Sequence, residues 1–321
     1  RNAELDINTF TSDGFTLIVD DAGTQNITVF WEAWGGTDIT VATVGDFAEP
    51  AATGNVDYTV TGFVAAATDQ VVMFSGASAT TINTAPAASD SNFYVGFASG
   101  GAAANNIVVL GNSDDASLTM DTDGYCKTGE CVANIVVAGG NATSRAQLTQ
   151  FGTNNFRLNW IARTGARQNI FMAIKGGNWT VGSYTIAGNS AGATATVSGL
   201  SYAPIGMSLI GCMTAEDAAG ISHVQDMIGF GTGTSTTSRR SMGILDEDGT
   251  ANSEIDMTVQ YDQVLSYPSA TGTLQAAYDI NAMNSDGFQI IVDTAGGVAS
   301  EWQGYLTFGS AGSAGQNIAV G

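Results

Sequence analysis

The chain has 321 residues, of which 44% are hydrophobic and 12% charged, and its formal net charge is −21. This length allows two or three domains with their own cores. The negative charge argues against a nucleic-acid-binding surface, which needs basic residues, and suits an extracellular or virion surface. No apolar run reaches the roughly 18 residues that a membrane-spanning helix needs. With 41 glycines and 4 prolines, the composition favours short strands and turns over helices.

The first recognisable element is a strand–turn–strand unit within residues 10–45. Phe15, Leu17 and Val19 alternate with other residues at the two-residue period of a strand. Residues 20–23, Asp-Asp-Ala-Gly, then supply turn chemistry, and a return strand ends at a Gly-Gly pair, residues 35–36. The pattern predicts a sheet-building unit.

This stretch occurs twice more along the chain, from residue 151 and from residue 283. Phe15, Phe156 and Phe288 occupy the same place in the three copies, at spacings of 141 and 132 residues. A period of that size indicates a repeated domain, because solenoid units are only 20–50 residues long.

The copies divide the chain into a closing half-unit, residues 1–47, and two full units of about 137 residues, 48–184 and 185–321. Each full unit has signals for eight or more short strands. The predicted fold class is therefore all-β, with tandem β-sandwich domains of jelly-roll-like type. One short helical turn is expected at 214–219, with Thr214 as its N-cap.

The half-unit raises a problem, because half a sandwich exposes unpaired strand edges. Three solutions stay open. The missing half was removed from or left out of this chain, or the half-unit adds its strands to a neighbouring subunit, or it folds back onto the second unit. Arg1 suggests a processed or truncated start, and no signal peptide is recognisable.

Charge is unevenly distributed. Between Cys131 and Thr214 there is no Asp or Glu, yet five of the nine basic residues lie there. This acid-free block either arises by chance or docks against an acidic patch of another subunit or a neighbouring protein. The candidate assembly contacts are Arg145, Arg157, Arg163, Arg167 and Lys175.

Three cysteines bear on the compartment. Cys126 and Cys131 could close a small loop by a disulfide if the compartment is oxidising, and the alternative is that they stay reduced. A single C-x4-C pair with one histidine in the chain is weak support for zinc. Cys212 lies in an apolar run and is expected to be a small buried residue.

Candidate chemistry is sparse. His223 is the sole histidine and is expected to be structural rather than a catalytic base. An acidic loop places oxygen ligands around a glycine, so it is either a solvated turn or a structural calcium site. Its candidate ligands are Asp246, Asp248, Asn252 and Glu254. No other cofactor is expected.

Exposed aromatic side chains can bind sugars by stacking. Strand alternation places at least half of the five tryptophans in the core. Trp34 and Trp179, which flank glycine pairs, are the two expected to be accessible and are the candidate glycan-binding residues.

Residues 10–17, Phe-Thr-Ser-Asp-Gly-Phe-Thr-Leu, and 31–36, Trp-Glu-Ala-Trp-Gly-Gly, resemble the close of a repeat found in structural proteins of tailed bacteriophages. Residues 285–288 match its first part, whereas the start of that repeat is degenerate here. The resemblance implies a non-enzymatic tail fibre, capsid decoration or other virion surface subunit. The resemblance names no ligand; the expected partners are other copies and other virion proteins, and a host surface glycan is a further candidate. The alternative is a carbohydrate-binding, adhesive or S-layer-like module.

Overall fold

A computed structural model describes residues 4–12, 14–21, 29–77, 79–80, 90–100, 104–113, 121–136, 141–220, 223–224, 226–246, 255–271, 273–296, 301–309 and 316–321. Over these residues the chain has 25 strands and no α-helix, so the all-β prediction is confirmed. The expected helical turn at 214–219 is absent from this described segment. Within the same ranges, no helix has the length and apolar character needed to cross a bilayer. The chain forms two compact units, Arg1–Trp31 and Glu32–Gly321.

The first unit is an antiparallel hairpin of β1 (Glu4–Phe10) and β2 (Phe15–Asp21). The amide N–H of Thr11 donates to the carbonyl oxygen of Gly14 at 2.8 Å and closes the turn. Its register shifts twice, between Glu4 and Leu5 and between Ile7 and Thr9, as β-bulges produce.

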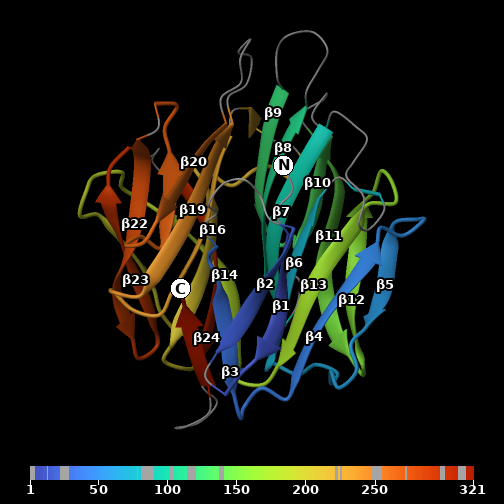
Figure 1. Ribbon diagram of the computed structural model, residues 1–321. Coiled ribbons are helices and arrows are strands. Elements are labelled where there is room, and N and C mark those ends of the chain that lie inside the picture. Colours follow the sequence, from blue (N-terminus) through green and yellow to red (C-terminus); the bar gives the residue numbers. More distant parts are fainter. Residues whose placement is uncertain are drawn as a thin grey trace. The chain divides into compact units, whose positions relative to one another are not determined.

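Over its described residues, the second unit contains two large sheets of seven and six strands, two four-stranded sheets and one small two-stranded sheet (Figure 1). In spatial order, the seven-stranded sheet consists of β17 (His223–Val224), β9 (Asp121–Thr128), β8 (Asn105–Ser113), β7 (Asp90–Ser99), β6 (Gln70–Ala77), β13 (Gln168–Lys175) and β4 (Val41–Ala48). The first four-stranded sheet consists of β10 (Val132–Val136), β11 (Asn141–Gly152), β12 (Asn155–Ala162) and β5 (Gly54–Thr59). The six-stranded sheet consists of β14 (Asn178–Ile186), β24 (Glu301–Gly309), β16 (Gly206–Cys212), β18 (Asp226–Gly233), β19 (Arg239–Asp246) and β20 (Ile255–Gln260). The second four-stranded sheet consists of β15 (Thr194–Val197), β23 (Gly287–Thr294), β22 (Leu274–Asn284) and β21 (Leu265–Pro268). The small sheet pairs β25 (Gln316–Val320) with β3 (Glu32–Gly36).

Three hydrophobic cores join these sheets into layers. The first core lies between the first four-stranded sheet and the seven-stranded sheet, and contains Tyr94 and Trp160. The third core lies between the six-stranded sheet and the second four-stranded sheet, and contains Phe288. The second core lies between the two large sheets and contains Val71 and Trp302. The large sheets therefore belong to two β-sandwiches and also pack on each other.

Strand sequences reflect this layering. β5 and β15 lie in the four-stranded sheets, and their residues alternate between partly buried and exposed. β16 is buried along its whole length, because Leu209 faces the third core and the next residue, Ile210, faces the second. A strand covered on both faces has no place for a polar alternation, so it reads as a continuous apolar run.

The two sandwiches have corresponding strand orders. The order β4-β13-β6-β7-β8-β9 in one large sheet corresponds to β14-β24-β16-β18-β19-β20 in the other. The order β5-β12-β11-β10 corresponds to β15-β23-β22-β21. Among the described strands, these pairings are all antiparallel. The β-sandwich architecture is thus as predicted, whereas the jelly-roll connectivity and the duplication stay predictions.

The expected unit boundaries do not match the sheets. The boundary after residue 47 falls inside β4, and the boundary after residue 184 falls inside β14. β4 is an edge strand of the first sandwich and β14 of the second. Most of each strand belongs to one sequence repeat, yet the strand pairs within the sandwich that the next repeat forms. The sequence repeat alone does not show this pairing.

Candidate functional site: the junction between the two sandwiches

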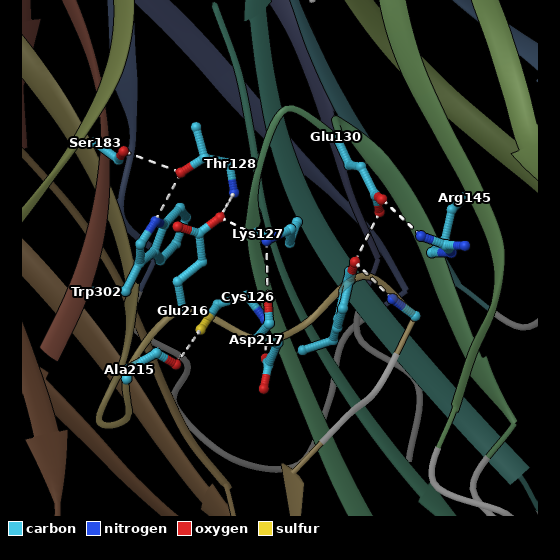
Figure 2. Close-up of polar contacts among 12 residues, drawn as sticks. Cys126, Lys127, Thr128, Glu130, Arg145, Ser183, Ala215, Glu216, Asp217 and Trp302 are labelled. Atoms are coloured by element: carbon cyan, nitrogen blue, oxygen red, sulfur yellow. Dashed lines mark hydrogen bonds and ion pairs between the residues drawn. The ribbon is translucent and has the colours of Figure 1, made fainter. Parts of the chain in front are cut away.

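Residues 213–220, here called the clamp segment, run from the second sandwich to the edge of β9 in the first (Figure 2). The segment follows β16, whose final residue, Cys212, forms a disulfide with Cys126 of β9. Cys126 and Cys212 both lie in the second core. The crosslink therefore joins the two large sheets covalently at the start of the clamp segment.

The clamp segment satisfies backbone groups at the edge of β9. The amide N–H of Cys126 donates to Oδ2 of Asp217 at 2.7 Å, and the amide N–H of Asp217 donates to the carbonyl oxygen of Cys126 at 3.1 Å. The amide N–H of Thr128 donates to Oε1 of Glu216 at 3.0 Å. Backbone donors on a bare edge would recruit a foreign strand, so these carboxylates protect the edge.

Lys127 adds a charged contact to the same segment. Its Nζ donates to Oε1 of Glu216 at 2.9 Å and to the carbonyl oxygen of Asp217 at 2.8 Å. Both members of the ion pair retain exposed side-chain surface. The pair therefore adds little stability by itself and mainly selects the position of the clamp segment.

Thr128 and Trp302 connect β9 and the clamp segment to the six-stranded sheet. The hydroxyl of Thr128 donates to Oγ of Ser183 at 3.0 Å and accepts from Nε1 of Trp302 at 2.9 Å. The backbone N–H of Trp302 donates to the carbonyl oxygen of Thr214 at 2.8 Å. Trp302 is buried in the second core, so its indole N–H needs a hydrogen-bond partner within the protein, and Thr128 provides it.

A second polar group lies at the other end of the clamp segment. The hydroxyl of Tyr125 donates to Oε2 of Glu130 at 2.9 Å and accepts from the amide N–H of Gly220 at 3.3 Å. Nη1 of Arg145 donates to Oε1 of Glu130 at 2.8 Å. Burial raises the pKa of Glu130, and the nearby Arg145 guanidinium opposes that rise. Burial also raises the pKa of Tyr125, so its hydroxyl stays protonated and available as a donor.

The expected pairing of Cys126 with Cys131 is wrong. Tyr125 and Cys126 are neighbours in β9 and face opposite sides of the sheet. Cys131 lies in the first core with Tyr125, and it is a buried free thiol. The partner of Cys126 is instead Cys212, on the other side of the sheet, so Cys212 has more than a packing role.

The acid-free block obtains its acidic partners from the same chain. Arg157 of β12 forms a bidentate ion pair with Asp57 of β5, at 2.7 and 2.9 Å, and Arg145 pairs with Glu130 as above. The other three basic residues have different surroundings. Arg163 donates to the carbonyl oxygen of Ala51, and Lys175 ends β13. Burial raises the pKa of Glu49, and the nearby positive charge of Arg167 opposes that rise. Internal ion pairs thus use two of the five charges predicted to bind another subunit.

The two candidate sugar-binding tryptophans both lie against the second core. Trp179 is 5% exposed, its Nε1 donates to the carbonyl oxygen of Gly176 at 2.6 Å, and its ring centroid is 5.6 Å from that of Phe308. The prediction that Trp179 is accessible is therefore wrong. Trp34 is partly buried and contacts the same Phe308 ring edge-to-face at 6.5 Å. Strand alternation turned both rings inward.

The expected calcium loop is only partly described. Asp246 is buried at the end of β19, whereas Asp248, Asn252 and Glu254 lie outside the described residues. In the described part of the chain, no three His, Cys, Asp or Glu side chains come together in a metal-binding group. The backbone of His223 pairs with Gly124, and its side chain lies outside the described part.

Sequence reasoning missed the residues that build the junction. Cys126 and Cys212 are 86 residues apart, and Glu216 and Asp217 were expected in a helical turn. No local spacing relates these groups to Cys126 and Lys127, because the relation arises from the packing of one sheet on another. No protein-family model, curated protein or solved structure shows a significant match to this chain.

Proposed function

We propose that the chain is a non-enzymatic structural subunit of a virion surface, as a tail fibre, capsid decoration or other appendage. The sequence resemblance described above supports this role. The disulfide between Cys126 and Cys212 supports a location outside the reducing cytoplasm, because structural disulfides persist in oxidising surroundings. Covalent and edge-protecting contacts at the junction suit a subunit that bears mechanical load.

The hairpin β1–β2 is the observation that carries this proposal. It has the same register and the same two bulge positions as hairpins β11–β12 and β22–β23. The pairs at one equivalent place in the three hairpins are Ile7–Leu17, Leu148–Leu158 and Ile280–Ile290. The second and third pairs are buried in sandwich cores.

In the first hairpin the corresponding residues are exposed. Ile7 is 58% exposed, Leu17 is 41% exposed and Phe10 is 74% exposed. An isolated two-stranded hairpin is only marginally stable in water, and a contiguous apolar face marks an interaction site. We infer that this face is covered when copies of the chain assemble. Sheet faces and edges, rather than the basic block, then provide the contacts, since Arg145 and Arg157 pair internally.

Sedimentation velocity over a range of concentrations, with electron microscopy of the product, tests this role. The purified chain should assemble, and Leu17→Asp should weaken assembly strongly by placing a charge on the apolar face. Thr16→Asp, which introduces the same charge on the opposite face of β2, is the matched control and should assemble. A chain that stays monomeric at high concentration, or equal behaviour of the two variants, contradicts the proposal.

No observation favours the carbohydrate-binding alternative over this role. Its candidate residue Trp179 is buried, and a stacking platform needs an exposed ring face.

A further inference from the structure

The small sheet of β25 and β3 repeats a pairing seen twice elsewhere in the second unit. We call β3, β13 and β24 the return strands, and β4, β14 and β25, which follow them along the chain, the linking strands. Linking strands pair antiparallel with return strands in all three cases. The opposed residues at one equivalent place are Thr43 and Ala173, Thr180 and Thr307, and Ala319 and Ala33.

Apolar pairs flank this place in the same way. Ile318 lies opposite Trp34, as Trp179 lies opposite Phe308. Ile318 and Trp34 are partly buried against the second core, to which Trp179 and Phe308 belong. In the pairing of β4 with β13, Ala42 lies opposite Ile174 at the same place. The three pairings therefore share their register and one apolar pair, as expected when one structural rule produces all of them.

The rule has a direction along the chain. β4 follows the return strand β3 but pairs with the next return strand, β13. β14 follows β13 and pairs with the next one, β24. β4 thus belongs to the first sandwich and β14 to the second, so each of them pairs within the sandwich that comes after it along the chain. β25 departs from this order, because it follows β24 and pairs with β3, which comes before both sandwiches.

A second copy of the chain restores the order. If β25 of one copy pairs with β3 of the next copy, every linking strand pairs with the return strand that comes next in the series. We propose that copies join head to tail by this strand exchange, in which β25 of one copy pairs with β3 of a neighbouring copy. This inference rests on the proposed function, because it specifies how the structural subunit would assemble.

Physical considerations favour the exchange. The same backbone hydrogen bonds and the same Ile318–Trp34 pair form within one chain or between two, which is the basis of domain swapping. β3 pairs with β25 alone among the described strands, whereas β13 and β24 each pair on both edges. A two-stranded sheet is weakly held, so its partner can be exchanged. Because the contact joins different surfaces of the two copies, repetition gives a filament or a ring.

Cysteine crosslinking distinguishes exchange from pairing within one chain. Ala319 and Ala33 are directly opposed, so one preparation carries Ala33→Cys and a second carries Ala319→Cys. In the folded chain, the native disulfide and the burial of Cys131 leave no other accessible thiol among the three natural cysteines. The two preparations are unfolded and refolded together, oxidised mildly and separated on a non-reducing gel. A crosslinked dimer in the mixture, but in neither preparation alone, is the expected result.

Two further variants complete the test. A chain carrying both substitutions should give a ladder of crosslinked multimers. Mixing Ala33→Cys with Gln316→Cys, whose Cα partner is Gly36 and not Ala33, should give much less dimer. A double variant that crosslinks only within single chains, or a mixture without dimer, overturns the exchange. If the unmodified chain assembles in sedimentation while the mixture gives no dimer, the structural role survives and only the exchange fails. A chain that never assembles fails both.

Discussion

Cys126 of β9 and Cys212 of β16 are joined by a disulfide that crosses from one sandwich to the other. The bond closes a loop with a sequence separation of 86 residues. In the chain-entropy description, a crosslink of that span restricts the unfolded chain and stabilises the fold by at most about 4.6 kcal/mol, and disulfides typically contribute about 2–4 kcal/mol. The bond also holds the clamp segment against the edge of β9.

Removing this bond should destabilise the protein measurably. The variant Cys126→Ser/Cys212→Ser should lose about 2–4 kcal/mol of unfolding free energy in a denaturant titration. A reductant should lower the stability of the unmodified protein towards that of the variant and leave the variant unchanged. Thiol titration of the unfolded, non-reduced protein should find one free thiol per chain, Cys131. A count of three would contradict the crosslink.

The clamp segment should control hydrogen exchange at the edge of β9. Asp217→Ala removes the acceptor of the Cys126 amide, and Glu216→Ala removes the acceptor of the Thr128 amide. Each change should cost about 1–2 kcal/mol locally and raise exchange at its own amide by roughly 5- to 30-fold. Asp57→Ala, which disrupts an ion pair on β5, serves as the control and should leave β9 unchanged. Equal protection of β9 in all three variants would show that the clamp contacts are dispensable.

A glycine in each sandwich lies beneath an aromatic ring of the neighbouring return strand. A Cβ at Gly45 would lie 2.6 Å from Cζ of Phe171, so Gly45→Ala should force this buried ring to move and cost about 1–3 kcal/mol. Gly35→Ala is the matched control, since a Cβ there meets no atom within 4 Å. Combining Gly45→Ala with Phe171→Leu should cost less than the sum of the two single changes. Additive losses would mean that ring and glycine do not contact each other.

Docking of β3 should depend on pH through Glu32. Oγ of Ser208 donates to Oε2 of this carboxylate at 2.8 Å, and removal from water raises its pKa to about 7 from 4.5. Because the docked pKa lies above the undocked value, docking is strongest below pH 4.5 and weakens as pH rises through 7. The loss amounts to at most about 3 kcal/mol.

Glu32→Gln tests this dependence, because it keeps a hydrogen-bonding side chain without a titrating group. Exchange of the β3 amides, corrected for the intrinsic effect of pH, should increase from pH 5 to pH 8 in the unmodified protein. The same amides should show little change in the variant. A pH dependence retained by Glu32→Gln would assign the effect to another group.

Much of the fold follows from local sequence. Alternation around Phe15, Phe156 and Phe288 predicted strands that the structure contains, because a two-residue period places apolar side chains on one face. The glycine pair at residues 35–36 was expected to end a strand, and β3 ends at Gly36. These predictions depend only on neighbours along the chain, so the sequence was sufficient for them.

The candidate site was not accessible to the same reasoning. Trp179 was expected to be one of the two accessible tryptophans, but packing of the six-stranded sheet on the seven-stranded sheet buries its ring. Strand alternation predicts which side chains share a face of the strand. It does not predict whether a second sheet covers the other face. Arg157 obtained its partner from strand pairing, because β12 pairs with β5 and sets Arg157 opposite Asp57, 100 residues away along the chain.

By itself, the sequence determined the strand-rich class, the hairpins, their apolar faces and the approximate period at which they recur. These features come from side-chain alternation and turn chemistry within a few residues. Only the tertiary structure decided that Cys126 meets Cys212 and not Cys131, that Glu216 and Asp217 cover the edge of β9, and that β25 pairs with β3. Each of these contacts joins segments far apart in sequence. The free energy that selects them comes from burying sheet faces against one another, which no local pattern contains.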